Sequence, residues 1–407
     1  MIKKNKFFLS KNDLYTILLL FVNLPLIIKS NDVPFRIIDG LFNSSEKETM
    51  GLDYAKGIET IKVFSATDDS YHYNNGVVMT SFKNNLYCMW QTSPKDEDSP
   101  DTIVVYSISE DMGKTWSAPK NLSNPVEGCF CTSGGWISTE YSLIAFINVF
   151  NSENFKKNGG ATQFRESIDG LNWSEQNELK MDDNSIFNGI FEQDPHKLPD
   201  GRIINAAHFQ PGLKLCPIYT DDPTGKTGWK KGKFNYTDNG DQSVELEPSF
   251  FVQNDGVLVM VMRDQRSRYI SLAAKSDDRG ETWSQTMETN MPDSRAKQCA
   301  GNLPDGTVFL VNNPGRVINN NNATWRVPLT ITLSKDGYFF TKSYLLRSGK
   351  DDDYPKQKYE GRANTLGYSY PKAFIHEDYL YVSYSTNKDD AEYTRIPIKE
   401  ISLVNKD

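Results

Sequence analysis

The sequence predicts an all-β fold, a six-bladed β-propeller of four-stranded antiparallel blades. Two observations support this. A short turn motif repeats at a near-constant interval, and strand-like runs rich in Val, Ile, Tyr and Phe alternate with Gly, Asp and Asn turns. The motif reads Ser-x-Asp-x-Gly-x-Thr-Trp, with full copies at Asp111 and Asp278 and shortened copies at Asp169 and Asp336. In such a turn the carboxylate accepts backbone N–H groups, the glycine supplies positive φ, and the tryptophan packs on the sheet.

The spacing of these aspartates gives the number of blades. The four positions are separated by 58, 109 and 58 residues, so the central gap is about twice the others. A degraded copy at Asp222 fills that gap, and one more step from Asp336 falls near residue 392, in the segment 387–392. A fixed interval of this size is typical of propellers, so we predict six blades.

The first thirty residues differ from the rest of the chain. Lys3, Lys4 and Lys6 precede an apolar run from Leu14 to Ile28, which is typical of a secretory signal peptide, with an uncleaved anchor as the alternative. We therefore assign 1–30 to this segment, 31–70 to an N-terminal extension with a candidate closing strand, and 71–407 to the propeller. The expected location is extracellular or the lumen of an endomembrane compartment such as the lysosome, with no other membrane association.

Composition excludes several classes of function. The net charge is −8 and no basic stripe stands out, so nucleic acid is not an expected partner. Five cysteines are too few, and odd in number, for a disulfide scaffold, and Cys129 and Cys131 lie too close in sequence for a zinc pair. We expect neither a metal nor another cofactor, and a monomeric protein. Five glycosylation sequons agree with secretion, at Asn43, Asn121, Asn172, Asn235 and Asn322.

Charged residues at the ends of predicted strands are the candidates for a functional site. Glu247 begins one strand and Arg263 ends the next, and His72 and His208 also fall at predicted ends of inner strands. Since the inner strands of all blades converge on the propeller axis, residues far apart in sequence can meet there. Which of Arg263, Arg266 and Arg268 faces the axis is left open by the sequence.

The repeated turns and the order of these residues resemble the sialidase (neuraminidase) superfamily, in which the turn is called an Asp box or BNR repeat. Glu247, followed by Pro and Ser, resembles the family's glutamate that partners the nucleophile. Arg263 resembles the second arginine of the family's carboxylate-binding triad, and Arg326 the third. The segment 367–371 resembles the stretch with the nucleophilic tyrosine, with Tyr368 the better match and Tyr370 the second.

The resemblance implies a glycan or glycoconjugate substrate and a retaining exo-glycosidase, with exo-α-sialidase as the leading activity. Sialic acid carries a carboxylate on its anomeric carbon, and guanidinium groups can bind it in a bidentate manner. A neutral tyrosine nucleophile avoids repulsion by that carboxylate. In the family an aspartate protonates the leaving group, and the candidates here are Asp96 and Asp98 in an acidic loop.

The sequence departs from the family at the first arginine of the triad. The corresponding residues 71–76 read Tyr-His-Tyr-Asn-Asn-Gly, so His72 and Asn74 are the expected substitutes. Two alternatives therefore remain. The first is a polysaccharide lyase or another glycosidase that acts on uronic-acid glycans, with His72 and His208 in the site. The second is a non-catalytic sugar-binding propeller.

Overall fold

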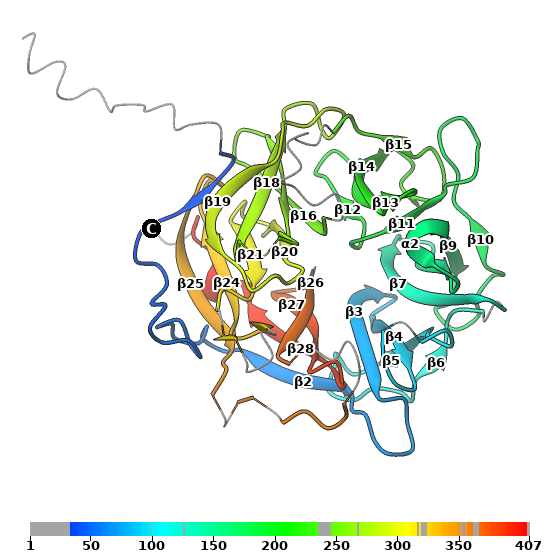
Figure 1. Ribbon diagram of the computed structural model, residues 1–407, viewed down its shortest axis with the longest axis horizontal. Coiled ribbons are helices and arrows are strands. Elements are labelled where there is room, and N and C mark those ends of the chain that lie inside the picture. Colours follow the sequence, from blue (N-terminus) through cyan, green and yellow to red (C-terminus); the bar gives the residue numbers. More distant parts are fainter. Residues whose placement is uncertain are drawn as a thin grey trace, which may run out of the picture. The chain divides into compact units, whose positions relative to one another are not determined.

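Six sheets, antiparallel apart from one short parallel pair, follow one another in chain order around a ring in the computed structural model (Figure 1). The first strands of most neighbouring blades contact each other, so they line the central axis. The predicted all-β, six-bladed propeller is confirmed. The structure describes residues 33–97, 99–124, 127–234, 246–266, 268–315, 317–318, 324–350, 353–354, 356–360 and 366–404. The predicted signal segment 1–30 and the candidate Asp98 lie outside these residues. Within them, no helix is long and apolar enough to cross a membrane.

Blades 1 to 3 are built from consecutive strands. Blade 1 contains β3 (Tyr73–Phe82), β4 (Asn85–Ser93), β5 (Ile103–Ser109) and β6 (Lys120–Asn121). Blade 2 contains β7 (Cys129–Ser138), β8 (Leu143–Asn151), β9 (Gly160–Ser167) and β10 (Asn177–Glu178), with the short helix α2 (Phe155–Asn158) between β8 and β9. In blade 3 the first strand is split, giving β11 (Gly189–Phe191), β12 (His196–Lys197), β13 (Ile203–Phe209), β14 (Lys214–Thr220) and β15 (Lys230–Lys231).

Blade 4 is again built from consecutive strands, β16 (Pro248–Val252), β17 (Leu258–Met262), β18 (Ile270–Ser276) and β19 (Met287–Pro292).

Blades 5 and 6 each include a strand from the N-terminal part of the chain. Blade 5 contains β20 (Cys299–Asn302), β21 (Val308–Asn312), β24 (Leu329–Ser334), β25 (Phe339–Arg347) and β1 (Arg36–Ile37). Blade 6 contains β26 (Tyr368–His376), β27 (Tyr379–Thr386), β28 (Asp390–Pro397) and β2 (Glu59–Phe64). The remaining elements are the hairpin β22 (Val317–Ile318) and β23 (Thr324–Trp325), and helix α3 (Ile398–Ile401).

The second strand of each blade is buried along nearly its whole length. In β8 every residue but the last is buried, and in β17 all five residues are buried. Each blade packs between two others, so both faces of a central strand are covered. This explains why these strands read as continuous apolar runs rather than as alternating patterns.

The aspartate turns have the expected internal hydrogen bonds. Asp111 Oδ1 accepts the Thr115 backbone N–H at 2.9 Å, and Asp111 Oδ2 accepts the Thr115 hydroxyl at 2.6 Å. Ser109 Oγ accepts the Gly113 N–H at 2.7 Å. These bonds hold the pKa of Asp111 at about 2. The degraded copy is a turn of the same kind, because the Asp222 carboxylate accepts the Thr227 N–H at 3.0 Å.

The prediction of a sixth aspartate turn near residue 392 is wrong. Aspartate turns join the third and fourth strands of blades 1 to 5, but in blade 6 the fourth strand is β2, from the N-terminal side of the chain. No turn can join β28 to β2 directly. The segment between Thr386 and Asp390, which pair with each other, is instead the hairpin turn between β27 and β28.

Strand β2 closes the ring by pairing antiparallel with β28. The hydroxyls of Thr60 and Thr394 lie 2.8 Å apart, and Lys62 Nζ donates to Asp390 Oδ2 at 2.9 Å. The first and last parts of the propeller therefore share one sheet, which joins the two ends of the ring.

Candidate functional site

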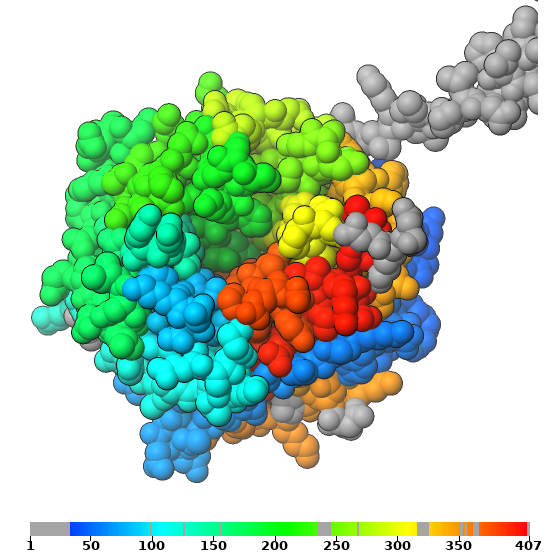
Figure 2. All heavy atoms as spheres, turned by 180° about the vertical axis from the view of Figure 1, so that it is seen from behind, coloured from blue at the N-terminus to red at the C-terminus, as the bar shows by residue number. Residues whose placement is uncertain are grey.

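Two cavities lie at opposite ends of the inner strands. The larger, of about 870 Å³, is lined by residues that include Asn254, Gly301 and Phe374. Figure 2 shows a hollow at the centre of the ring between the green, yellow and orange segments. The smaller cavity, of about 430 Å³, is lined near the other end of β26 by Tyr370. Charged residues converge in the smaller cavity, so we treat it as the candidate site.

Glu247 and Arg263 form an ion pair in this cavity. Glu247 directly precedes β16 and Arg263 directly follows β17, and these strands pair antiparallel, so the two ends meet. Arg263 Nη1 donates to Glu247 Oε2. Burial raises the pKa of Glu247, but the charges of Arg263 and Lys297 outweigh burial and hold that pKa well below its ordinary value. The Glu247 carboxylate is therefore ionised at neutral pH.

A lysine, a glutamate and a histidine extend the cluster. Lys297 Nζ lies 3.3 Å from Glu192 Oε2 and 3.7 Å from Glu247 Oε1. His208 Nδ1 lies 2.9 Å from Glu192 Oε1, and His208 Nε2 lies 2.8 Å from the Leu246 carbonyl oxygen. Both partners are acceptors, so both ring nitrogens donate and the imidazole is protonated. Burial lowers the pKa of His208, but Glu192 outweighs burial and raises it overall. In this arrangement His208 cannot act as a general base.

Tyr370 enters the cavity because strand β26 is irregular there. A β-bulge interrupts the ladder between Ser369 and Lys372, and Tyr370 has a φ of 56°. Positive φ is unusual for an aromatic residue and is often found at functional sites. Over the Tyr370 ring lie Arg326 Cζ, 4.7 Å from the centroid, and Lys297 Nζ, 5.2 Å from it.

Arg326 reaches this position through a close contact between blades 5 and 6. Its backbone N–H donates to the Leu366 carbonyl at 2.9 Å, and its own carbonyl accepts the Tyr368 N–H at 2.9 Å. Gly367, between them, has a φ of 104°, and a side chain there would collide with the Arg326 backbone. Glycine at this position thus lets Arg326 lie against the start of β26.

Tyr368, the first choice for the nucleophile from the sequence, lies in the core between blades. Its side chain is fully buried, and its hydroxyl donates to the Ser348 carbonyl at 2.9 Å. Its ring packs edge-on against Tyr384, with a centroid distance of 5.6 Å, and Arg347 Cζ lies 4.8 Å from its centroid. Burial raises the pKa of Tyr368 well above its usual value. It is not among the described residues that line the candidate cavity, whereas Tyr370 is.

The acidic loop of blade 1 reaches the cavity through Glu97. Asp96 lies in the loop after β4, where its carbonyl accepts the Ser93 hydroxyl at 2.6 Å, and it is not one of the described lining residues. Glu97 lines the cavity and accepts from Lys388 Nζ at 3.1 Å. Burial raises the pKa of Glu97, but Lys388 and Arg326 outweigh burial and lower it overall.

Neither expected substitute for the missing arginine is among the described lining residues. Asn74 is fully buried. Its amide nitrogen donates to the Asp389 carbonyl at 2.8 Å, and its amide oxygen accepts from Trp90 and Thr92, each at 2.9 Å. His72 stacks on Tyr359 with a centroid distance of 3.7 Å. Both side chains therefore serve the packing between blades 1 and 6.

A family model described as a BNR repeat-like domain matches residues 84–382, well over half of the chain. The chain belongs to this family. The resemblance expected from the aspartate turns is thereby confirmed: this is a sialidase-like BNR propeller. A comparison with curated proteins finds no match.

Solved sialidase structures share the fold of this BNR propeller. One, called a sialidase, matches with a TM-score of 0.61 and 19% identity over 89% of this chain, which spans only 35% of that protein's length. The Hadza microbial sialidase Hz136 matches with a TM-score of 0.65 and 16% identity, over 84% of this chain and 69% of its own. A Trypanosoma rangeli sialidase in complex with 2,3-difluorosialic acid, a covalent intermediate, matches with a TM-score of 0.59 and 13% identity, over 86% of this chain and 60% of its own. At these identities the likeness shows the fold.

Of the three arginines that follow β17, Arg263 lines the cavity of the BNR propeller. Arg268 pairs with Asp264 and Glu288, the latter on the outer strand β19. Arg266 is not among the described lining residues. Within the described part of the chain, no group of three or more His, Cys, Asp or Glu could hold a metal ion.

Several charged residues of the site were missed in the sequence. They share a simple signal, a charge next to or within an inner strand or at a blade hairpin, which is the same signal that identified Glu247. Their pattern in the sequence is otherwise ordinary, and only the convergence of blades shows that they meet. They are Glu97, Glu192, Lys297, Lys372 and Lys388.

Proposed function

We propose that this protein is a retaining exo-glycosidase that removes a terminal sugar carrying a carboxylate, with sialic acid as the leading substrate. One observation carries the proposal. A tyrosine on a strained strand and a carboxylate paired with an arginine line one cavity, and a second arginine lies over the ring of that tyrosine. Tyr370, Glu247, Arg263 and Arg326 are these residues.

The two arginines are suited to bind an anion. Arg263 Nε and Arg326 Nη1 are buried, and each lacks a hydrogen-bond partner among the described residues. A buried donor without a partner costs free energy, which a ligand carboxylate would recover with charge-assisted bonds. This supports a substrate whose carboxylate lies close to the reacting carbon.

Tyr370 is the nucleophile in this proposal. Its phenolic oxygen attacks the anomeric carbon and gives its proton to the Glu247 carboxylate, forming a glycosyl–tyrosine bond as the bond to the leaving oxygen breaks. A substrate carboxylate on Arg263 would compete with Glu247 for the guanidinium. The pKa of Glu247 would then rise from its lowered value, so binding would make Glu247 a better base.

The leaving oxygen requires a proton from an acid on the other side of the sugar. The loop of Asp96 and Asp98 remains the candidate, because Glu97 between them reaches the cavity. In the second step the same acid, now a carboxylate, takes a proton from water. The water oxygen replaces Tyr370 on the anomeric carbon, and Glu247 returns the proton to the phenolate.

The test combines turnover with covalent trapping. We expect the protein to release the fluorophore from a fluorogenic sialoside. We also expect 2,3-difluorosialic acid to add its fluorosialyl group to the peptide with Tyr370, seen by mass spectrometry, with no label in Tyr370→Phe. A label on another residue, or neither label nor turnover in the folded wild-type protein, would refute this assignment.

The lyase alternative is now less supported, because His208 is protonated and doubly bonded and His72 does not line the cavity. A lyase would instead give a product with a new double bond that absorbs in the ultraviolet when uronic-acid polysaccharides are offered. A non-catalytic sugar-binding propeller would bind a sialoside without turnover and without label.

A further inference from the structure

Three cationic side chains surround the ring of Tyr370. Arg326 and Lys297 were described above, and the third is Lys388, whose Nζ lies 5.6 Å from the ring centroid. Lys388 belongs to the hairpin turn between β27 and β28. It is only 2% exposed and does not appear among the described lining residues. Its charge therefore lies close to the Tyr370 ring without lining the cavity.

Lys388 also lies beside the place where an arginine was expected from the resemblance. The backbone N–H of Asn74 donates to the Lys388 carbonyl at 2.7 Å. The Asn74 side chain is fully used within the fold, so it brings no donor to the cavity. A positive charge is thus present in this corner of the site, but it comes from blade 6 and not from blade 1.

The turn that carries Lys388 is held on several sides. Asn387 Oδ1 accepts from Tyr354 Oη at 2.7 Å and from the Gly367 N–H at 3.0 Å. Asn387 and Lys388 themselves have φ values of 55° and 57°. These contacts fix one end of the turn to the segment before β26.

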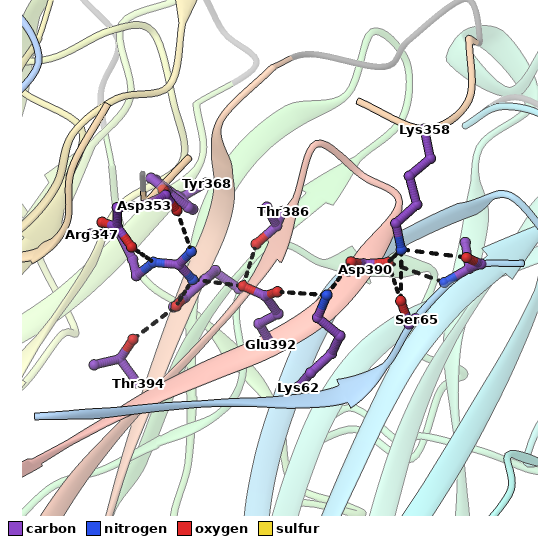
Figure 3. Close-up of polar contacts among 12 residues, drawn as sticks. Lys62, Ser65, Arg347, Asp353, Lys358, Tyr368, Thr386, Asp390, Glu392 and Thr394 are labelled. Carbon is purple, nitrogen blue, oxygen red and sulfur yellow. Dashed lines mark hydrogen bonds and ion pairs between the residues drawn. The ribbon is translucent and has the colours of Figure 1, made fainter. Parts of the chain in front are cut away.

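The other end of the turn joins the polar network shown in Figure 3. Asp390 accepts from Lys62 of β2 at 2.9 Å and from Lys358 at 2.6 Å. Glu392 binds Arg347 at 2.7 Å. The closing strand and the loop before β26 therefore hold the turn from behind. A buried cation on such a fixed turn is pre-organised, since it does not have to be ordered when charge develops nearby.

We infer that Lys388 is a positioning residue for Tyr370, which stabilises the negative charge that develops on the phenolic oxygen when Tyr370 becomes a nucleophile. Glu97, its carboxylate partner at 3.1 Å, holds the ammonium in place and partly offsets its charge. The inference rests on the proposed function, because it requires Tyr370 to be the nucleophile. It assigns to Lys388 an effect on the rate of covalent bond formation and none on the binding of substrate.

The experiment measures labelling by 2,3-difluorosialic acid in two parts, the inhibitor concentration at half-saturation and the maximal labelling rate. Fluoride leaves without a proton from a general acid, so the maximal rate reports on the nucleophile. In Lys388→Met we expect this rate to fall about 10- to 100-fold, as one charge at this distance in a protein interior would give. The half-saturating concentration should change less than about threefold, because an interaction that strengthens only as the bond forms does not change binding.

Three further variants separate charge from structure. Lys388→Arg should recover most of the rate, because it restores the positive charge. The Glu97→Gln variant should be labelled at least as fast as wild type, since the substitution removes the offsetting charge. If the ion pair served the structure alone, loss of either partner would slow labelling to the same extent. Lys342→Met is the matched control. Lys342 Nζ lies 5.2 Å from the ring of Tyr344 on the outer strand β25, away from the cavity, and its loss should leave labelling unchanged.

The outcomes distinguish the two proposals. If wild type is labelled on Tyr370 but Lys388→Met labels at the wild-type rate, or only its half-saturating concentration rises, the role of Lys388 is refuted and the proposed function stands. If the folded wild-type protein is not labelled on Tyr370, the proposed function fails and the role of Lys388 fails with it.

Discussion

Two tyrosines two residues apart on one strand should respond in opposite ways to the same substitution. In Tyr368→Phe the lost hydroxyl leaves the buried Ser348 carbonyl without its donor at 2.9 Å. Such a loss costs about 1–3 kcal/mol of the free energy of unfolding, or a few degrees of Tm for a protein of this size. Turnover per folded molecule should remain near that of wild type, because Tyr368 does not line the cavity.

Tyr370→Phe should show the reverse. Its side chain is only partly buried and lies outside the interblade core, so we expect a change in unfolding free energy within about 0.5 kcal/mol. Loss of the nucleophile should lower kcat for a fluorogenic sialoside by about 10³-fold or more. Thermal unfolding by circular dichroism and sialoside turnover, measured on both variants and wild type, give the comparison. If Tyr368→Phe abolished turnover at unchanged Tm while Tyr370→Phe kept wild-type turnover, the assignment of the site would be refuted.

Three other perturbations test the cluster and the fold. Because the pKa of His208 is raised in the folded protein, its proton stabilises the fold fully below about pH 6.5, and this stability is lost as pH rises through the raised pKa. His208→Phe should therefore flatten the dependence of Tm on pH in that range, and an unchanged dependence would contradict the protonated state. Arg263→Met leaves the buried Glu247 without its main partner and should cost about 3–5 kcal/mol in chemical denaturation, with part of the loss recovered when Glu247→Gln is added. Gly113→Ala should lower Tm, because Gly113 has a φ of 88° and a methyl group there would collide with the Tyr393 hydroxyl, whereas equal stability would show that the turn can rearrange.

The two tyrosines also show where sequence reasoning stops. Residues 368 and 370 would share a face in a regular strand, so the sequence offers no reason to separate them. The bulge between Ser369 and Lys372 breaks this alternation, and the positive φ at Tyr370 turns that side chain into the cavity. A bulge of this kind depends on the neighbouring blade, where Arg326 pairs with Gly367, and leaves little trace in the sequence.

The misplaced sixth turn has a similar cause. The repeat interval correctly predicts six blades, since each interval measures the length of chain that one blade uses. The interval cannot show that the ring closes with a strand from the other end of the chain. Strand β2 takes the fourth place of blade 6, and the segment 387–389, which carries Lys388, is the hairpin turn between β27 and β28.

The turn motif and its repeat spacing predict the fold class and the number of blades, because both depend on residues close together in the sequence. The sequence also places Glu247 and Arg263 at the ends of neighbouring strands, without showing that they pair. The structure adds which tyrosine enters the cavity, that Glu247 pairs with Arg263, that Asn74 and His72 are used in packing, and that Lys297 and Lys388 approach Tyr370. This is because every blade contributes residues to the centre of a propeller. The partners of a charged residue on one inner strand lie on strands tens to hundreds of residues away in the sequence, so no local sequence pattern predicts these contacts.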